Sequence, residues 1–106
     1  MGQNFEIVKS LQKDGDTLTV ELFGSLGVDT ADQLTEKLEG QLDDVKTLIF
    51  DMKMLAYVTS AGIRSLIRAI KIVQKNGGNV ITRHVNQDVL GIFDLMNITS
   101  LVTIEG

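Results

Sequence analysis

Residues 47–85 read TLIFDMKMLAYVTSAGIRSLIRAIKIVQKNGGNVITRHV, and this stretch decides the fold class. It opens with the near-continuous apolar run of residues 47–52, which is typical of a central strand. We expect Asp51 to close this strand and a connector to follow it. From residue 60 to residue 75 apolar side chains recur every three or four positions, which indicates one face of an amphipathic helix.

The pair Gly77-Gly78 predicts the end of this helix, because glycine readily adopts the left-handed conformation that commonly follows a helix. Residues 79–85 then have the pattern of a further strand. A strand, a helix of this length and a second strand indicate a right-handed crossover between parallel strands. The stretch therefore predicts an α/β fold.

Two short runs upstream have the pattern of a β-hairpin. Residues 5–11 and 17–23 are separated by a turn that contains Asp14-Gly15, a preferred pair for tight hairpins. In the second run Leu18, Val20 and Leu22 alternate with mostly polar residues, which is the period of a strand with one buried face. We expect helices to cover that face.

Three further elements complete the pattern. A helix is expected to begin near Asp29 or Thr30, one of which would be its N-cap, and its apolar stripe comprises Ala31, Leu34, Leu38 and Leu42. Residues 87–95 indicate a short helix and residues 101–105 a last strand. The predicted order is ββαβαβαβ: a small mixed β-sheet that opens with a β-hairpin, the remaining strands being mainly parallel with crossover helices.

Composition narrows the function classes. With 106 residues, 43% of them hydrophobic and 23% charged, we expect one globular domain over residues 1–106. The chain has no cysteine and one histidine, so we expect no thiol chemistry and none of the usual zinc or iron–sulfur sites. Neither glycine-loop motif for nucleotides occurs, and we expect no metal and no cofactor. A net charge of −4 disfavours nucleic-acid binding. No apolar run approaches the roughly 18 residues of a membrane span and no targeting signal follows Met1, which predicts a cytoplasmic protein without a membrane partner.

One short segment stands out as a candidate site. Thr59 and Ser60 place two hydroxyl groups at the start of the predicted helix, where the ordinary role of such residues is to cap it. Capping does not account for Gly62, since glycine inside a helix costs about 1 kcal/mol relative to alanine. Gly62 therefore indicates a close neighbour, either another backbone segment or a partner protein.

Nearly the whole chain resembles the anti-sigma factor antagonists of the STAS domain family. A Gly-x-Leu stretch after the hairpin is matched by Gly24-Ser25-Leu26, and the apolar strand by residues 48–51. The hallmark in many members is aromatic, apolar, Asp, Ser, Ser or Thr, Gly, Leu, and residues 57–63 here read YVTSAGI. Residues 92–96 with Ile98 and Leu101 are similar to the family's third helix and final strand.

The resemblance implies a non-enzymatic regulatory module that is phosphorylated at Ser60. Such a module binds an anti-sigma factor or a related serine-protein kinase, and so controls sigma-factor-dependent transcription. A phosphatase of the PP2C type would reset the cycle. The implied partner-binding residues are Gly27, Thr59, Ser60, Ala61, Gly62 and Arg64.

Two departures from the family pattern leave an alternative open. Many phosphorylated members have Asp where this chain has Thr59, and another Asp where it has Gly27. Asp29 and Asp51 are the acidic residues nearest in sequence that could replace them. The alternative is a non-phosphorylated STAS interaction or scaffold domain of a larger signalling assembly.

Two other features were weighed on their residues alone. The basic stripe on the second helix is a solvated face or a partner surface, and it comprises Arg64, Arg68, Lys71 and Lys75. His84 is expected to be a packed or surface residue rather than a ligand, because no second ligand type clusters near it in the sequence.

Overall fold

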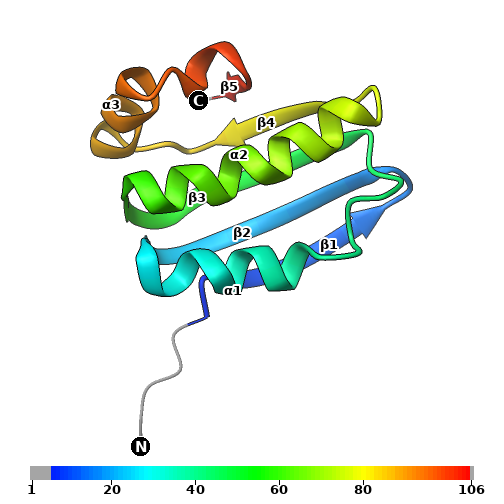
Figure 1. Cartoon of the computed structure of the whole chain (residues 1–106), viewed down its shortest axis with the longest axis horizontal. Coiled ribbons are helices and arrows are strands. Elements are labelled where there is room, and N and C mark those ends of the chain that lie inside the picture. Colours follow the sequence, from blue (N-terminus) through cyan, green and yellow to red (C-terminus); the bar gives the residue numbers. More distant parts are fainter. Residues whose placement is uncertain (1–5, 106) are drawn as a thin grey trace, which may run out of the picture.

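The computed structural model describes residues 6–105, and within them five strands form one sheet in the order β1-β2-β3-β4-β5 (Figure 1). The strands are β1 (Val8–Asp14), β2 (Thr17–Leu26), β3 (Thr47–Val58), β4 (Asn79–Arg83) and β5 (Thr103–Glu105). The helices are α1 (Val28–Leu38), α2 (Ser60–Lys75), α3 (Gln87–Leu95) and the short 3-10 helix η1 (Ile98–Ser100).

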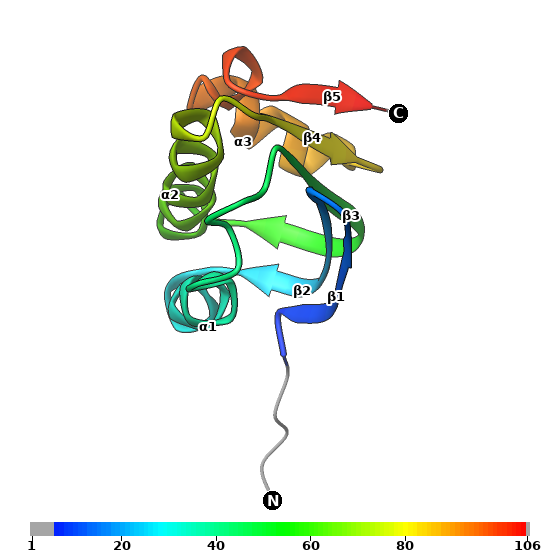
Figure 2. The ribbon, with the colours of Figure 1, turned by 90° about the vertical axis from the view of Figure 1, so that its right-hand side faces the viewer.

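The sheet is mixed, as the sequence predicts. β1 and β2 form an antiparallel hairpin around Gly15, which has a positive φ of 64°, and all the other neighbouring strands are parallel. Figure 2 shows α1 and α2 side by side on one face of the sheet. The predicted element order is confirmed, and with it the α/β class.

The core lies between that face and the two helices. Leu18, Val20 and Leu22 are at most 1% exposed, and the alternate positions of β2 remain partly open, so the predicted period of two is confirmed. Leu34 and Leu38 of α1 are buried as expected. Leu42 is also buried, although it follows the helix.

Helix α2 has the predicted bounds, and the reason for its end is visible in its hydrogen bonds. Gly77 has a φ of 82°, and its N–H donates to the carbonyl of Gln74. The N–H of Gly78 donates to the carbonyl of Val73 at 2.9 Å. This pair of bonds is the Schellman arrangement, which satisfies carbonyls that a helix end leaves free.

Several predicted strand ends were wrong. β3 continues past Asp51 to Val58, because its backbone stays paired with β2 through irregular steps where the exposed side chains break the apolar pattern. β4 ends at Arg83, since His84 has a positive φ of 58° and cannot extend the strand. β1 begins at Val8, and the predicted Phe5 lies outside the described residues. β2 runs on to Leu26, and β5 begins only at Thr103.

The predicted N-cap of the first helix was also wrong. Gly27 is the N-cap, and Asp29 and Thr30 lie inside the first turn. The Thr30 hydroxyl accepts a hydrogen bond from the Gly27 N–H at 2.9 Å and donates one to the Ser25 carbonyl at 2.8 Å. Thr30 therefore caps the helix from within, as the third residue of a capping box does.

Candidate functional site

The starts of α1 and α2 lie next to each other at one edge of the sheet (Figure 1). Leu26 and Val58 end the parallel strands β2 and β3 in register, and the two helices follow at once. The Thr59 N–H donates to the Leu26 carbonyl at 2.9 Å, which ties the two connections together. The carboxyl ends of parallel strands are where α/β proteins commonly place their functional groups.

The close neighbour that Gly62 indicated is the backbone of Leu26. A Cβ on Gly62 would lie 2.3 Å from the Leu26 carbonyl oxygen, a distance that no side chain tolerates. Gly62 is buried, so packing within the fold explains why this position is a glycine. The absence of a side chain lets the first turn of α2 pack directly on the end of β2.

Three hydroxyl groups near the start of α2 have different surroundings. The Thr59 Oγ1 accepts from the Gly62 N–H at 3.3 Å, so Thr59 is the N-cap. Ser65 is buried, and its hydroxyl donates to the Gly62 carbonyl at 2.7 Å. Ser60 is the first helical residue and is exposed, and its hydroxyl makes no hydrogen bond within residues 6–105. Of the three, Ser60 is the accessible nucleophile.

Gly27 and Thr59, the two positions at which the resemblance implies Asp in many phosphorylated members, lie close together. A Cβ on Gly27 would lie 3.4 Å from Cγ2 and 3.5 Å from Oγ1 of Thr59. Neither residue is acidic, and helix α2 contains no Asp or Glu. Asp29, one of the two suggested replacements, is exposed in the first turn of α1.

Asp51, the other suggested replacement, does not reach this site. It lies seven residues before the end of β3, roughly 20 Å of strand away. Its Oδ1 is 3.0 Å from Nδ1 of His84 and accepts from the Lys53 N–H at 3.1 Å. Burial raises the pKa of Asp51, but the hydrogen bonds from His84 and Lys53 and the charges of His84 and Arg83 outweigh it, so the pKa lies below its usual value. Asp51 is part of a separate cluster on the sheet.

Two exposed apolar residues at this edge were not among the predicted partner-binding residues. Val28, the first residue of α1, is 74% exposed, and Tyr57, near the end of β3, is 44% exposed. Val28 was not predicted to be a surface residue of the site, because the first helix was expected to begin near Asp29 or Thr30. We define the α2-start surface as seven exposed or partly exposed residues around the start of α2: Gly27, Val28, Tyr57, Thr59, Ser60, Ala61 and Arg64.

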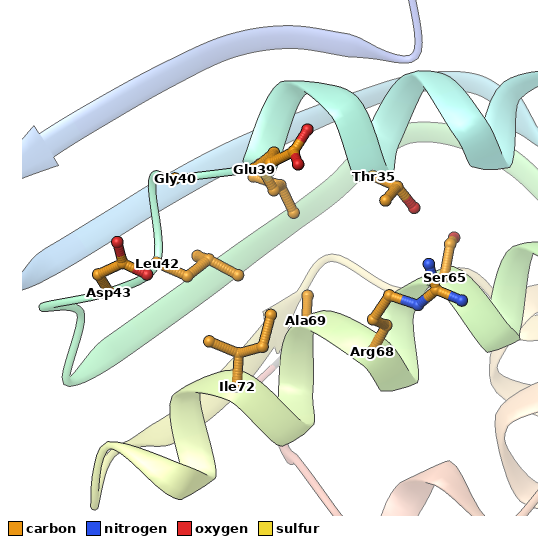
Figure 3. Close-up of a pocket in the computed structure, with 10 residues that line it drawn as sticks. Thr35, Glu39, Gly40, Leu42, Asp43, Ser65, Arg68, Ala69 and Ile72 are labelled. Carbon is orange, nitrogen blue, oxygen red and sulfur yellow. The ribbon is translucent and has the colours of Figure 1, made fainter.

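A cavity of about 290 Å³ lies between the end of α1, the loop after it and the middle of α2 (Figure 3). Its walls are largely apolar, with Arg68 on one side and Glu39 and Asp43 on the other. Ser65 also lines it, but its hydroxyl is already held by Gly62. Within the part of the chain that is described, no group of three or more His, Asp or Glu residues could hold a metal ion.

The chain is thus a small α/β fold with a hairpin-led mixed sheet and an exposed serine at the start of its second main helix. The family model of the STAS domain matches residues 9–105, so this chain belongs to the STAS domain family. None of the helices in residues 6–105 is long and apolar enough to cross a membrane.

Three known proteins show the breadth of the similarity. The chain is 22% identical to the anti-sigma-B factor antagonist of Bacillus subtilis (strain 168) over 95 residues, which are 90% of this chain and 87% of that protein. The anti-sigma factor antagonist SpoIIAA in its unphosphorylated form has the same fold, with a TM-score of 0.73, 17% identity and coverage of 92% and 86% of the two chains. A sulfate transporter family protein from Wolinella succinogenes matches with a TM-score of 0.70, 18% identity and coverage of 80% and 70%.

Proposed function

We propose that this chain is a regulatory protein-binding module that binds an anti-sigma factor with serine kinase activity and is switched by phosphorylation at Ser60. The observation that carries the proposal is the exposure of Ser60 at the first position of α2, while the neighbouring hydroxyls of Thr59 and Ser65 are engaged. The similarity to an anti-sigma-B factor antagonist supplies the class of partner.

The transfer would use ATP as the phosphoryl donor. The Ser60 Oγ forms a bond to the γ-phosphorus as the bond from that phosphorus to the bridging oxygen breaks, ADP leaves, and the hydroxyl proton passes to a base of the kinase. The product carries about −1.5 to −2 charges at neutral pH. A helix N-terminus favours negative charge, so the fold tolerates the modification.

The α2-start surface is the proposed contact with the partner. Ser60 and Arg64 are exposed, Thr59 and Ala61 are partly exposed, and Gly27 lies against Thr59. Gly62 is buried and contributes by holding α2 close to β2. A phosphate on Ser60 adds desolvation and repulsion to any contact that covers this surface, so binding is lost while folding is kept.

The cycle then follows from the two states. The unmodified chain sequesters the anti-sigma factor and so frees the sigma factor for transcription, and a PP2C-type phosphatase restores that state after phosphorylation. In this scheme the module works in the cytoplasm, needs no cofactor and catalyses no reaction itself.

A second candidate is a non-phosphorylated interaction or scaffold domain. The closeness of Gly27 and Thr59 favours it, because the place where family members have two carboxylates carries none here. The sulfate transporter family relative shows that the same fold occurs in proteins of another class.

A pull-down from the cell extract of the source organism, followed by a kinase assay with site mapping, separates the two candidates. We expect a captured kinase-like protein to phosphorylate the wild-type chain and the Ser60→Ala variant to take up no phosphate. The variant Ser25→Ala, which removes another exposed hydroxyl at this edge, is the matched control and should behave as wild type. Phosphorylation that persists in Ser60→Ala overturns the site, and a captured kinase that leaves the wild type unmodified favours the scaffold.

A further inference from the structure

We propose that Arg64 holds the phosphate placed on Ser60, so that phosphorylation also withdraws the Arg64 guanidinium from the partner surface. This inference rests on the proposed function, because it concerns the phosphorylated state of the same site. It assigns to one residue of α2 a role in the switch itself, in addition to a contact with the partner.

The helix geometry places the two residues together. Ser60 and Arg64 are both exposed on α2 and are four residues apart, a spacing that brings Cβ atoms to about 5–6 Å on one helix face. Side chains of a helix lean toward its N-terminus, so Arg64 leans toward the turn that contains Ser60. An anion followed by a cation four residues later is also the more stabilising order of such a pair.

Arg64 has no competing partner in the described structure. Helix α2 contains no acidic residue, and none of the ion pairs formed within residues 6–105 includes Arg64. Among the described residues its guanidinium is therefore unpaired before modification, and Arg64 is exposed to solvent. A phosphate would be the first anion on its own helix.

The chemistry of the two groups is complementary. A guanidinium presents several N–H donors in a planar fork that matches phosphate oxygens, and such charge-assisted bonds are stronger than neutral ones. The Gly62 N–H is already bound to Thr59 Oγ1, so one donor of the first turn is occupied. Arg64 supplies charged donors that this turn lacks.

The consequence for binding is a switch with two components. In the unmodified chain, both the Ser60 hydroxyl and the Arg64 guanidinium are available to a partner. In the phosphorylated chain, the phosphate covers the first and draws the second toward itself. One modification thus adds negative charge at one point of the surface and neutralises the positive charge at a neighbouring point.

Phosphoserine installed at position 60 by genetic encoding allows a direct test without a kinase. The probe is the phosphate itself, titrated by ³¹P NMR in the full-length chain. A neighbouring guanidinium favours the dianion, so the second pKa of the phosphate, about 6 in an exposed phosphoserine, should be lowered. We expect Arg64→Gln to raise that pKa by at least about 0.3 unit.

Two further variants make the test specific. Arg64→Lys keeps the charge and should recover part of the shift, although it lacks the planar fork. Arg68→Gln removes an equal charge about 12 Å from Ser60 along the helix, beyond the screening length of about 8 Å in physiological salt, and should leave the pKa unchanged. Circular dichroism of each variant verifies that α2 is intact.

The outcomes separate this inference from the proposed function. An identical phosphate pKa in wild type and Arg64→Gln, or an equal effect of Arg68→Gln, overturns the proposed role of Arg64 even if a kinase modifies Ser60. A phosphate pKa that is raised only by the Arg64 variants supports the role of Arg64 even if no kinase is found. In that case only the proposed function fails. Once the partner has been purified, Arg64→Gln should also reduce the factor by which phosphorylation weakens its binding.

Discussion

Gly27 and Thr59, which follow different strands, are close neighbours: a Cβ added to Gly27 would lie at contact distance, 3.4 Å, from the Thr59 Cγ2. This closeness arises because Leu26 and Val58 end β2 and β3 in register. It brings together the two positions where this chain departs from the family's acidic pattern. A carboxylate at either position would therefore lie at the same place, beside the start of α2.

Gly27→Asp should raise the rate of Ser60 phosphorylation at least about tenfold, because a carboxylate beside Thr59 can help to orient the nucleophile. Gly27 has a φ of −141°, which any residue adopts, and Asp is a better N-cap, so α1 should gain about 0.5 kcal/mol. Initial rates with the cognate kinase and a urea denaturation curve measure both effects. Gly27→Asn gives the same capping without charge, and an equal rate for both variants would show that the carboxylate is not responsible.

Thr59→Asp should also raise the phosphorylation rate while leaving the fold intact. The Thr59 Oγ1 accepts from the Gly62 N–H, and an Asp carboxylate at an N-cap accepts the same bond. The measurement is the initial rate of phosphate incorporation at Ser60. Thr59→Asn is the control, because it keeps the capping side chain without the charge. A phosphorylation rate in Thr59→Asp at or below that of wild type would mean that phosphoryl transfer to Ser60 does not use a carboxylate at this position.

Gly62→Ala should destabilise the protein by about 1–3 kcal/mol, although alanine is the better helix former. The new Cβ would lie 2.3 Å from the Leu26 carbonyl oxygen, which is backbone and cannot move aside without disturbing β2. Gly91→Ala is the matched control, because Gly91 is exposed in α3 and its Cβ would meet nothing within 4 Å. That variant should gain about 0.5–1 kcal/mol. Equal stabilities of the two variants by urea denaturation would contradict the close approach.

The sequence predicts best where periodicity and a stop signal agree. Helix α2 has both an apolar stripe and the glycines that end it, and its bounds agree with the predicted span of about Ser60 to Lys75. The end of β3 was missed because its pairing with β2 persists after the apolar alternation fails, and pairing depends on a strand remote in sequence. The first helix was placed late because its N-cap is Gly27, a residue without a capping side chain.

The same difference between local and long-range information applies to the residues of the candidate site. Ser60 was singled out by the register of the family hallmark, two residues before Gly62, which is local information. The closeness of Gly27 and Thr59 depends on the register between two strands. The pair of Asp51 and His84 depends on the positive φ of His84, which no local sequence signal requires. Neither relationship is contained in a single segment of the chain.

The Asp51–His84 pair predicts a pH dependence of stability at low pH. Because the pKa of Asp51 is lower when folded than when unfolded, its stabilising contribution is complete above the unfolded value of about 3.9 and is lost as the pH falls through the folded value. Asp51→Asn should therefore be less stable than wild type at pH 7, and the difference should shrink below about pH 4. Urea midpoints at pH 7 and pH 3 measure it. A difference that is constant with pH would show that the carboxylate charge is not involved.

Ser60→Asp separates switching from folding. One negative charge at the first position of α2 interacts favourably with the helix dipole by about 0.3–1 kcal/mol, so the melting temperature should hold or rise slightly. Affinity for the cognate anti-sigma factor should fall at least about tenfold, or 1.4 kcal/mol, because the charge must be desolvated against the partner. Gln41→Glu adds the same charge in the exposed loop after α1, away from the α2-start surface, and should bind as wild type. Calorimetric titration of all three chains gives the affinities. An unchanged affinity in Ser60→Asp would show that the start of α2 is not the switch, and a collapse of the melting temperature would show that Ser60 serves the structure.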